Sequence, residues 1–437
     1  MDMEEGEQYM SFKLEVTHPP YVLMSSDYSQ QEPKLSAYVS QDPKLIDAFT
    51  HGRDAYATLV STALNVPYEE CLEFNPVTGE LQPEGKARRG IGKVLNLGVT
   101  YGMSVPSIAD SLFGDRDDMT DDEKIKEGTK IHDSLMKGFP GLAKAIERTQ
   151  QQATKVGYTE TILGRRRYHP DMQLPKYEFV PMPGYVNPDI DPLDPESLKN
   201  KEQIPKRIID SLVKEFNSYT WYGKIVKRTK ELAEQKIRVI NNVYKIEEAS
   251  RQCFNAVIQG SAADLTKMAI LRLESDPEWK SIGGRFVVPI HDELLCEVPL
   301  ENAEKGAEVL ARCMCEAGSF FPFKLSCDVE TTFRWYGLGI EDVLSKERPE
   351  SLDWDKLSPS NIEWIQSRLV ECEYTLPVLK EADGSKPSGI RARGVNGQLT
   401  DDLKAAVKDY KARYNIESDD QFLDHIDTKV VQGVIQR

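Results

Sequence analysis

Two aspartates that lie far apart in the chain, Asp27 and Asp292, each stand beside a short apolar segment. Tyr21–Met24 predicts a strand that ends at Asp27, and Phe286–Val298 predicts two strands joined by a turn that holds Asp292. If these strands are neighbours, the two carboxylates can bridge a pair of divalent cations, as nucleotidyl transfer from a triphosphate requires. Glu293 is then the expected auxiliary ligand. Each segment taken alone is also an ordinary turn sequence.

Positive charge for the phosphates is available in the segment between the two aspartates. A helix is predicted from about Ala87 to Tyr101, and it carries Arg89 and Lys93 one turn apart. A guanidinium and an ammonium group at this spacing can bind the same triphosphate, although a solvated basic helix face is the alternative. The helix places four side chains in one row: Arg89, Lys93, Leu97 and Tyr101.

The composition is unusual for a protein that binds nucleic acid. The 437 residues include 71 Asp and Glu against 55 Lys and Arg, a net charge of −16. Binding of DNA therefore needs a locally basic surface. Residues 201–238 supply ten Lys and Arg against five Asp and Glu, and we expect Lys224, Lys227 and Arg228 to contact the DNA backbone. A solvated helix face is the alternative.

Other features of the composition indicate a soluble protein of a reducing compartment. The seven cysteines are scattered, which is typical of reduced thiols. No stretch of 18 apolar residues is present, and the N-terminus is acidic, so no membrane span or secretory signal is expected. The predicted location is the cytoplasm, or the host cytoplasm if the protein is viral.

Six segments in a fixed order resemble the family A DNA polymerases, the bacterial DNA polymerase I group and its phage relatives. Asp27–Glu32 is similar to the first palm motif, Arg89–Gly102 to the fingers helix, and His291–Glu293 to the last palm motif. Residues 40–49, 157–166 and 251–264 agree as well. The resemblance covers roughly residues 20–172 and 245–335, which correspond to palm and fingers.

The resemblance implies an α+β fold, with an antiparallel palm sheet that carries Asp27 and Asp292 and a helical fingers domain. Residues 173–200 are expected to be irregular and residues 205–270 mostly helical. The expected domains are the first part of the palm with the catalytic strand (1–34), the fingers (35–172), an insertion (173–244), the second part of the palm with the His-Asp-Glu hairpin (245–340), and a mixed helical C-terminal extension of unknown role (341–437).

The resemblance also implies roles for single residues. Asp27 and Asp292 would bind two Mg²⁺ ions, for which Mn²⁺ can substitute, and Glu293 would assist. Lys93 would be the general acid for pyrophosphate, and Glu32 would exclude a ribose 2′-hydroxyl. The residues expected to contact the deoxynucleotide are Gln30, Glu32, Tyr56, Arg89, Lys93, Leu97 and Tyr101. Those expected to contact DNA are Arg165, Arg166, Arg251, Asn255, Gln259 and His291.

Departures from the family pattern include two of the expected nucleotide contacts. Leu97 stands where the family commonly has an aromatic residue, which puts the discrimination against sugars lacking a 3′-hydroxyl in doubt. Tyr56 stands where the family has a histidine that reaches the triphosphate, and tyrosine can donate a hydrogen bond but carries no positive charge.

The expected function is template-directed DNA synthesis, with deoxynucleoside triphosphates and primer-template DNA as partners. Only 26 residues precede Asp27, so we expect a second polypeptide to supply a thumb and possibly an exonuclease. The chain would then be the polymerizing part of a split or truncated enzyme in viral DNA replication. Two alternatives are a single-subunit RNA polymerase and a non-catalytic DNA-binding subunit of a replisome.

Overall fold

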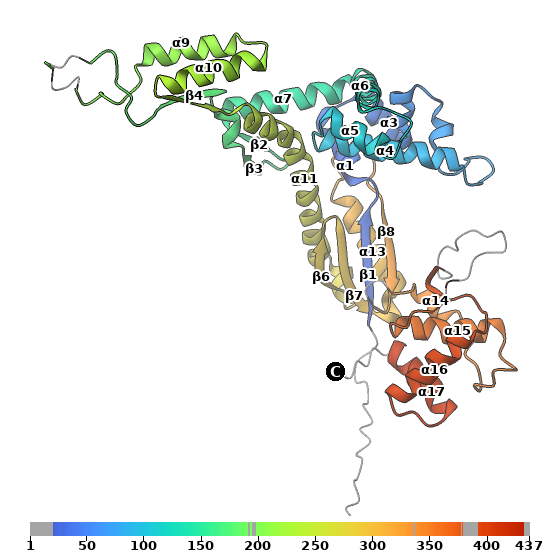
Figure 1. Cartoon of the computed structure of the whole chain (residues 1–437). Helices are drawn as coiled ribbons and strands as arrows, with labels where there is room; N and C mark the ends of the chain where they lie inside the picture. Colours follow the sequence, from blue (N-terminus) through green and yellow to red (C-terminus); the bar gives the residue numbers. More distant parts are fainter. Residues whose placement is uncertain are drawn as a thin grey trace, which may run out of the picture. The chain divides into compact units, whose positions relative to one another are not determined.

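The computed structural model describes residues 21–190, 193–194, 198–334, 337–376, 378 and 392–431. The first 20 residues of the expected palm segment and parts of the expected C-terminal extension lie outside these ranges. The described residues form two compact units (Figure 1). One contains the residues up to Gln31 and those from Leu265 onward, and the other runs from Glu32 to Asp264.

A four-stranded antiparallel sheet forms the centre of the first unit. Its strand order is β6 (Arg285–Ile290), β7 (Glu293–Pro299), β1 (Tyr21–Tyr28) and β8 (Cys327–Thr332). Side chains of β1 alternate between the core and the opposite face, as the period of a strand requires. Because Tyr28 is still paired with β8, the strand continues one residue beyond the predicted end at Asp27.

Helix α13 (Ala303–Glu316) packs against β1 and β8 and follows the short helix η3 (Leu300–Asn302) (Figure 1). The buried Tyr28 donates a hydrogen bond of 2.8 Å to the carbonyl oxygen of Met314 near the end of α13. This bond ties the end of β1 to the helix that covers the sheet.

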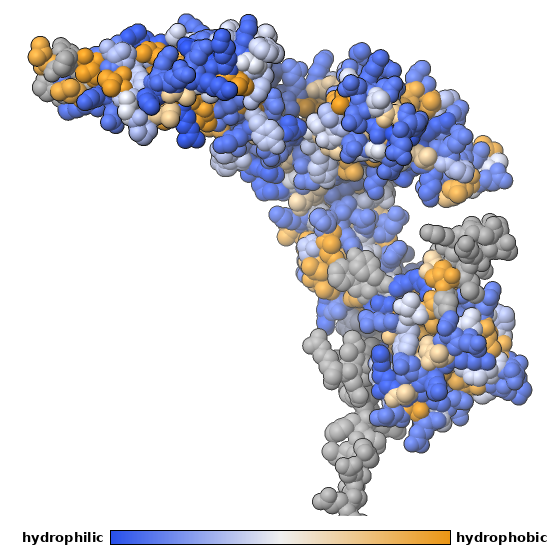
Figure 2. All heavy atoms as spheres, viewed as in Figure 1, coloured by the Kyte–Doolittle hydropathy of each residue, from blue (hydrophilic) through white to orange (hydrophobic). Residues whose placement is uncertain are grey.

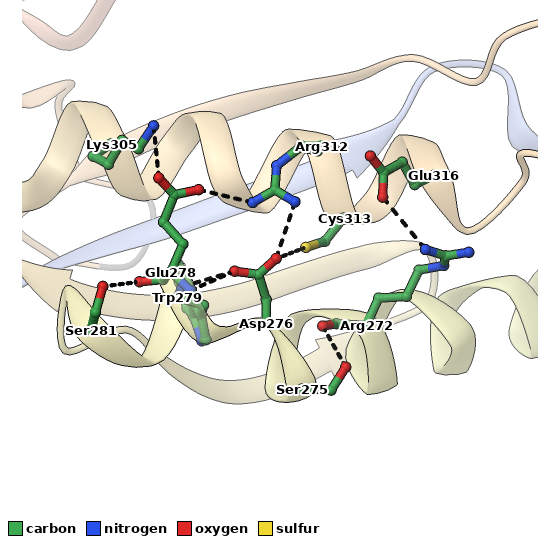
Figure 3. A network of polar contacts seen from close by, with 10 residues as sticks. All are labelled: Arg272, Ser275, Asp276, Glu278, Trp279, Ser281, Lys305, Arg312, Cys313 and Glu316. Carbon is green, nitrogen blue, oxygen red and sulfur yellow. Dashed lines mark hydrogen bonds and ion pairs between the residues drawn. The ribbon is translucent and has the colours of Figure 1, made fainter.

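A polar network joins α13 to the helix α12 (Pro277–Ser281) and to the end of α11 (Val243–Ser275) (Figure 3). Asp276 caps α12 by accepting from the backbone N–H groups of Glu278 and Trp279. Arg312 of α13 binds both Asp276 and Glu278, with N–O distances of 3.0 Å in each case. One guanidinium therefore holds two helices together beside the palm sheet.

The C-terminal residues of the first unit form a small helical bundle with its own hydrophobic core, which includes Trp364, Tyr410 and Phe422. The buried Arg368 pairs with Asp427 at 3.1 Å, which joins α15 to α17. The helices are α14 (Ile340–Leu344), α15 (Pro359–Glu371), α16 (Asp401–Arg413) and α17 (Asp419–Val431).

Most of the second unit is helical. Asp42 caps α2 through the backbone N–H groups of Lys44 and Leu45, and its other oxygen accepts from the N–H of Gly141 at 2.8 Å. One carboxylate thus joins the starts of α2 and α7. The helices are α1 (Gln31–Ser40), α2 (Pro43–Thr50), α3 (Ala55–Leu64), η1 (Tyr68–Cys71), α4 (Pro83–Thr100), α5 (Val105–Phe113), α6 (Asp121–Gly138) and α7 (Pro140–Val156).

A predicted hairpin follows α7 and is confirmed. It consists of β2 (Tyr158–Glu160) and β3 (Arg166–Tyr168), after which comes the short helix η2 (Pro170–Gln173).

The segment predicted as an insertion has a structure that the sequence pattern did not indicate. Residues 173–200 were expected to be irregular, but β4 (Tyr177–Pro181) is a strand that pairs with β5 (Ile237–Asn241). β5 also interrupts the region expected to be helical. The two strands are more than 50 residues apart, so local composition could not reveal the pairing. Between them lie α9 (Lys206–Asn217) and α10 (Tyr222–Glu234), which pack with the strands around Phe216.

No helix in the described part of the chain combines the length and the apolar character that a membrane-spanning segment needs. All seven cysteines are free thiols. The sulfur atoms of Cys315 and Cys327 lie 3.9 Å apart beneath the palm sheet.

Candidate functional site

The register of the palm sheet brings the two predicted aspartates together. Ser26 of β1 is paired with Leu294 of β7, so the next residue, Asp27, lies beside the turn between β6 and β7. His291 adopts a left-handed backbone conformation (φ 57°) in this turn, and Asp292 follows it. The carboxyl group of Asp292 lies close enough to that of Asp27 to raise the pKa of Asp27, both by its charge and by hydrogen bonding to the protonated form.

The environment of Asp27 disfavours its negative charge. Neighbouring atoms withdraw part of its hydration, although the residue faces solvent, and this effect raises the pKa. The charge of Asp292, its hydrogen bonding and the charge of Glu293 act in the same direction and bring the pKa of Asp27 to about 6. Two carboxylates this close repel each other when both are ionised, and a bound cation would offset this repulsion.

Two further polar groups lie at this end of the sheet. Ser25 donates a short hydrogen bond to Glu293, which orients the carboxylate of the expected auxiliary ligand. Asp328 of β8 is the direct cross-strand partner of Asp27, and Ser29 donates to it at 3.4 Å. Ser25 and Asp328 were not among the predicted site residues. Alternation along β8 could have suggested Asp328, but only if the pairing of β8 with β1 were known.

The neighbouring carboxylates of Asp27 and Asp292 are oxygen donors of the kind that hold Mg²⁺. Among the described residues, no cluster of three or more His, Cys, Asp or Glu side chains is arranged to hold a metal ion. Mg²⁺ is commonly held by one or two carboxylates and completes its coordination with water and phosphate oxygens. The pair Asp27 and Asp292 fits this requirement, and their role as metal ligands stays a prediction.

The predicted phosphate-binding helix exists as α4, but it begins at Pro83 rather than near Ala87. Proline is favoured in the first turn of a helix, where its missing N–H is no loss. Lys93 is exposed on this helix and Leu97 is half-buried. Tyr101 forms the C-cap, and its hydroxyl donates to Glu32 at 3.4 Å.

Arg89 interacts with two residues at the start of α3, Asp54 and Tyr56. Its Nη2 and Nε lie 2.9 and 3.1 Å from Oδ2 of Asp54, and its guanidinium lies over the ring of Tyr56, 5.2 Å from the centroid. Asp54 also caps α3 by accepting from the N–H of Ala57. The helices can approach this closely because Gly92 of α4 has no side chain: a Cβ there would lie 2.1 Å from the carbonyl oxygen of Tyr56.

Two predicted nucleotide contacts, Arg89 and Tyr56, are therefore neighbours in the structure. Asp54, the carboxylate that pairs with Arg89, was not predicted as a neighbour of this residue. It lies 35 residues before Arg89, and helical spacing within α4 gives no signal for it.

The predicted DNA-contacting row on α11 has one half-buried face. Arg251, Asn255 and Gln259 are all partly exposed, whereas most residues between them, including Phe254 and Ile258, are buried. Among the described residues, the buried side-chain oxygen of Asn255 has no hydrogen-bond partner.

The two hairpin arginines differ in their surroundings. Arg165 pairs with Asp264 of α11 at 2.8 Å and donates to the carbonyl oxygen of Gly260 at 2.7 Å. Arg166 pairs with Glu160 and lies over the ring of Tyr158, 4.4 Å from the centroid. Arg165 thus links the hairpin to α11, while Arg166 is held on the hairpin itself.

Comparison with known proteins places the chain in a family. The sequence profile of DNA polymerase family A matches residues 5–179 and 201–337, which is more than half of the chain. The chain belongs to this family, whose members are DNA-directed DNA polymerases.

Two curated relatives show the extent of the similarity. The thermostable DNA polymerase I of Thermus aquaticus is 26% identical over 327 residues, which cover 75% of this chain and 28% of the relative. DNA polymerase I of Mycobacterium tuberculosis (strain ATCC 25618 / H37Rv) is 26% identical over 313 residues, 71% of this chain and 24% of the relative. The chain thus spans about a quarter of the length of these relatives.

A solved structure is similar as well. The polymerase domain of Pol1 from M. smegmatis, in complex with DNA primer-template and dNTP, is 24% identical with a TM-score of 0.48. The match covers 72% of this chain and 40% of that chain.

Proposed function

We propose that this chain catalyses template-directed DNA synthesis, in which a deoxynucleoside triphosphate reacts with a primer 3′-hydroxyl and pyrophosphate is released. Membership in DNA polymerase family A supports the reaction class. The observation that carries the proposal is that Asp27, near the end of β1, lies beside Asp292 in the turn that leads into the neighbouring strand β7. Such a pair binds hard cations together with phosphate oxygens.

Asp27 and Asp292 are the proposed ligands of two Mg²⁺ ions, for which Mn²⁺ can substitute, and Glu293 assists. The ions supply a lowered pKa for the attacking hydroxyl and positive charge for the phosphates. Ser25 holds the Glu293 carboxylate in place by its hydrogen bond. The palm residues therefore position the metal and the reacting hydroxyl.

The residues on and beside α4 are the proposed contacts of the incoming nucleotide. Arg89 binds the triphosphate, and the exposed Lys93 donates a proton to the departing pyrophosphate. Glu32 excludes a ribose 2′-hydroxyl, and its hydrogen bond from Tyr101 fixes the carboxylate. Tyr101 itself packs on the new base pair.

We further propose a role in DNA replication of a virus, with a second polypeptide that supplies the thumb. The need for a second polypeptide is tested by the length of the product that the purified chain makes during one encounter with a primer-template. Short, distributive products that lengthen when a partner is added support it. Long products made by the chain alone contradict it.

Primer extension on a template of mixed sequence tests the reaction and separates the alternatives. DNA polymerase activity predicts Mg²⁺-dependent addition of the complementary deoxynucleotide at each position. Preferential addition of ribonucleotides would indicate the RNA polymerase alternative. Binding of the primer-template without any addition would indicate the non-catalytic alternative.

A further inference from the structure

Two aromatic side chains at the start of α10 are exposed although a packed core lies beneath them. Trp221 is 66% and Tyr222 is 69% exposed, while Phe216 and Leu232 of the same segment are buried. The core is therefore complete without these two rings. Large aromatic residues held in solvent commonly mark a binding surface.

The ring of Trp221 is supported from one side. A Cβ placed on Gly223 would lie 2.4 Å from two atoms of the indole, so the ring lies directly over the backbone of the first turn of α10. Its exposed fraction shows that much of the remaining surface is open to solvent. An exposed aromatic ring whose other side is supported by the backbone can accept a base by stacking.

Positive charge accompanies the ring along the same helix. Lys224 and Lys227 lie one turn apart on α10, the helix that begins directly after Trp221, and both are exposed. Within the described part of the chain, no carboxylate lies at ion-pair distance from either lysine. Figure 2 shows mainly hydrophilic residues over α9 and α10 in this view.

Ion pairs in the structure limit which of the predicted basic residues are available to bind DNA. Arg228 was expected to contact DNA together with the two lysines, but its guanidinium pairs with Glu215 at 2.9 Å and with Glu231 at 3.1 Å. Arg228 therefore stabilises the α9–α10 pair. The positive charge available to a ligand comes from the lysines.

We propose that Trp221, Lys224 and Lys227 form a binding site for single-stranded DNA. A base stacks on the indole, and the lysines neutralise neighbouring phosphates. Stacking accepts any base and phosphate contacts carry no sequence information, so the site is not sequence-specific. The inference rests on the proposed function only in that a copied template provides single-stranded DNA.

The test uses the full chain and a fluorescein-labelled oligothymidine of 20 nucleotides, with affinity measured by fluorescence anisotropy. Trp221→Ala should weaken binding about 5- to 100-fold, and Trp221→Phe should retain most of the affinity. Gly223→Ala should also weaken binding, because the methyl group displaces the ring. Alanine favours a helix over glycine, so this variant should keep its helical content in circular dichroism.

The lysines are tested by salt dependence. Lys224→Gln combined with Lys227→Gln should reduce the slope of log affinity against log salt by about 1.4, since each phosphate contact on a single strand contributes about 0.7. Arg228→Gln is the control: it should lower stability, because it leaves Glu215 without its ion pair, and leave the slope unchanged.

Unchanged affinity in both Trp221→Ala and Gly223→Ala would overturn the proposal. Primer extension by the same variants separates this result from a failure of the proposed function. A chain without polymerase activity would show no extension even as wild type, whatever its affinity for the oligonucleotide.

Discussion

The ion pair between Arg89 and Asp54 makes a specific prediction about nucleotide binding. If Arg89 binds the triphosphate, the phosphates must compete with a carboxylate that already holds the guanidinium at 2.9 Å. Asp54→Asn removes the charge but keeps a side chain that caps α3 well. The variant should therefore bind the deoxynucleotide more tightly and fold less stably.

The size of the expected changes in stability and in KM follows from the solvent exposure of the Arg89–Asp54 ion pair. The side chains of Arg89 and Asp54 are 32% and 18% exposed, so solvent screens the pair only in part. A pair of this kind contributes about 1 kcal/mol to stability. The free energy of unfolding should fall by about that amount, and release of Arg89 should lower the KM for the deoxynucleotide about fivefold.

Two measurements on three proteins test this reasoning. Urea denaturation gives the free energy of unfolding, and steady-state incorporation of one nucleotide gives KM. Asp54→Ala is the matched comparison, because it also removes the N-cap bond to Ala57 and should cost about 1 kcal/mol more with a similar change in KM. An unchanged or higher KM in Asp54→Asn would refute the assignment of Arg89 as a phosphate ligand that Asp54 restrains.

Three other perturbations have defined outcomes. The pKa of Asp27 is raised from 3.8 to about 6 in the folded state, so the folded protein binds this proton more tightly than the unfolded chain does. Without metal, the free energy of unfolding measured by urea denaturation should therefore fall as the pH rises from about 4 to about 6. Asp27→Asn should remove this pH dependence. Mg²⁺ binding followed by calorimetry should weaken below about pH 6 and release protons there. Glu32→Ala should raise the ratio of ribonucleotide to deoxynucleotide incorporation, and an unchanged ratio would exclude Glu32 as the gate. Gly92→Ala should destabilise the chain by about 1–3 kcal/mol in urea denaturation, because its Cβ would overlap the backbone of Tyr56; a loss below about 0.5 kcal/mol would mean that the helices move apart freely.

Local signals in the sequence predicted much of the palm and fingers. The strand before Asp27 and the turn at Asp292 depend on neighbours within a few residues, and each occurs as expected. The helical row that contains Arg89 and Lys93 is likewise a property of a single helix.

Features that depend on distant segments were not predictable in this way. The strand β4 exists because β5 pairs with it, and Pro181 at its end gave the segment the composition of a loop. The pairing of Arg89 with Asp54 depends on the packing of α3 against α4, which composition does not specify. The same holds for Asp328, whose place beside Asp27 is set by the register of β8.

Incorporation of a single nucleotide under single-turnover conditions tests the central claim most directly, namely that Asp27 and Asp292 form the metal site of a DNA polymerase. Asp27→Asn and Asp292→Asn should each slow incorporation by roughly 10³-fold or more, about 4 kcal/mol, with unchanged circular dichroism. Glu297→Gln is the control, since this carboxylate lies on β7 but pairs with Arg285, and its rate should stay close to wild type. Incorporation above about 1% of the wild-type rate in either aspartate variant would contradict the assignment.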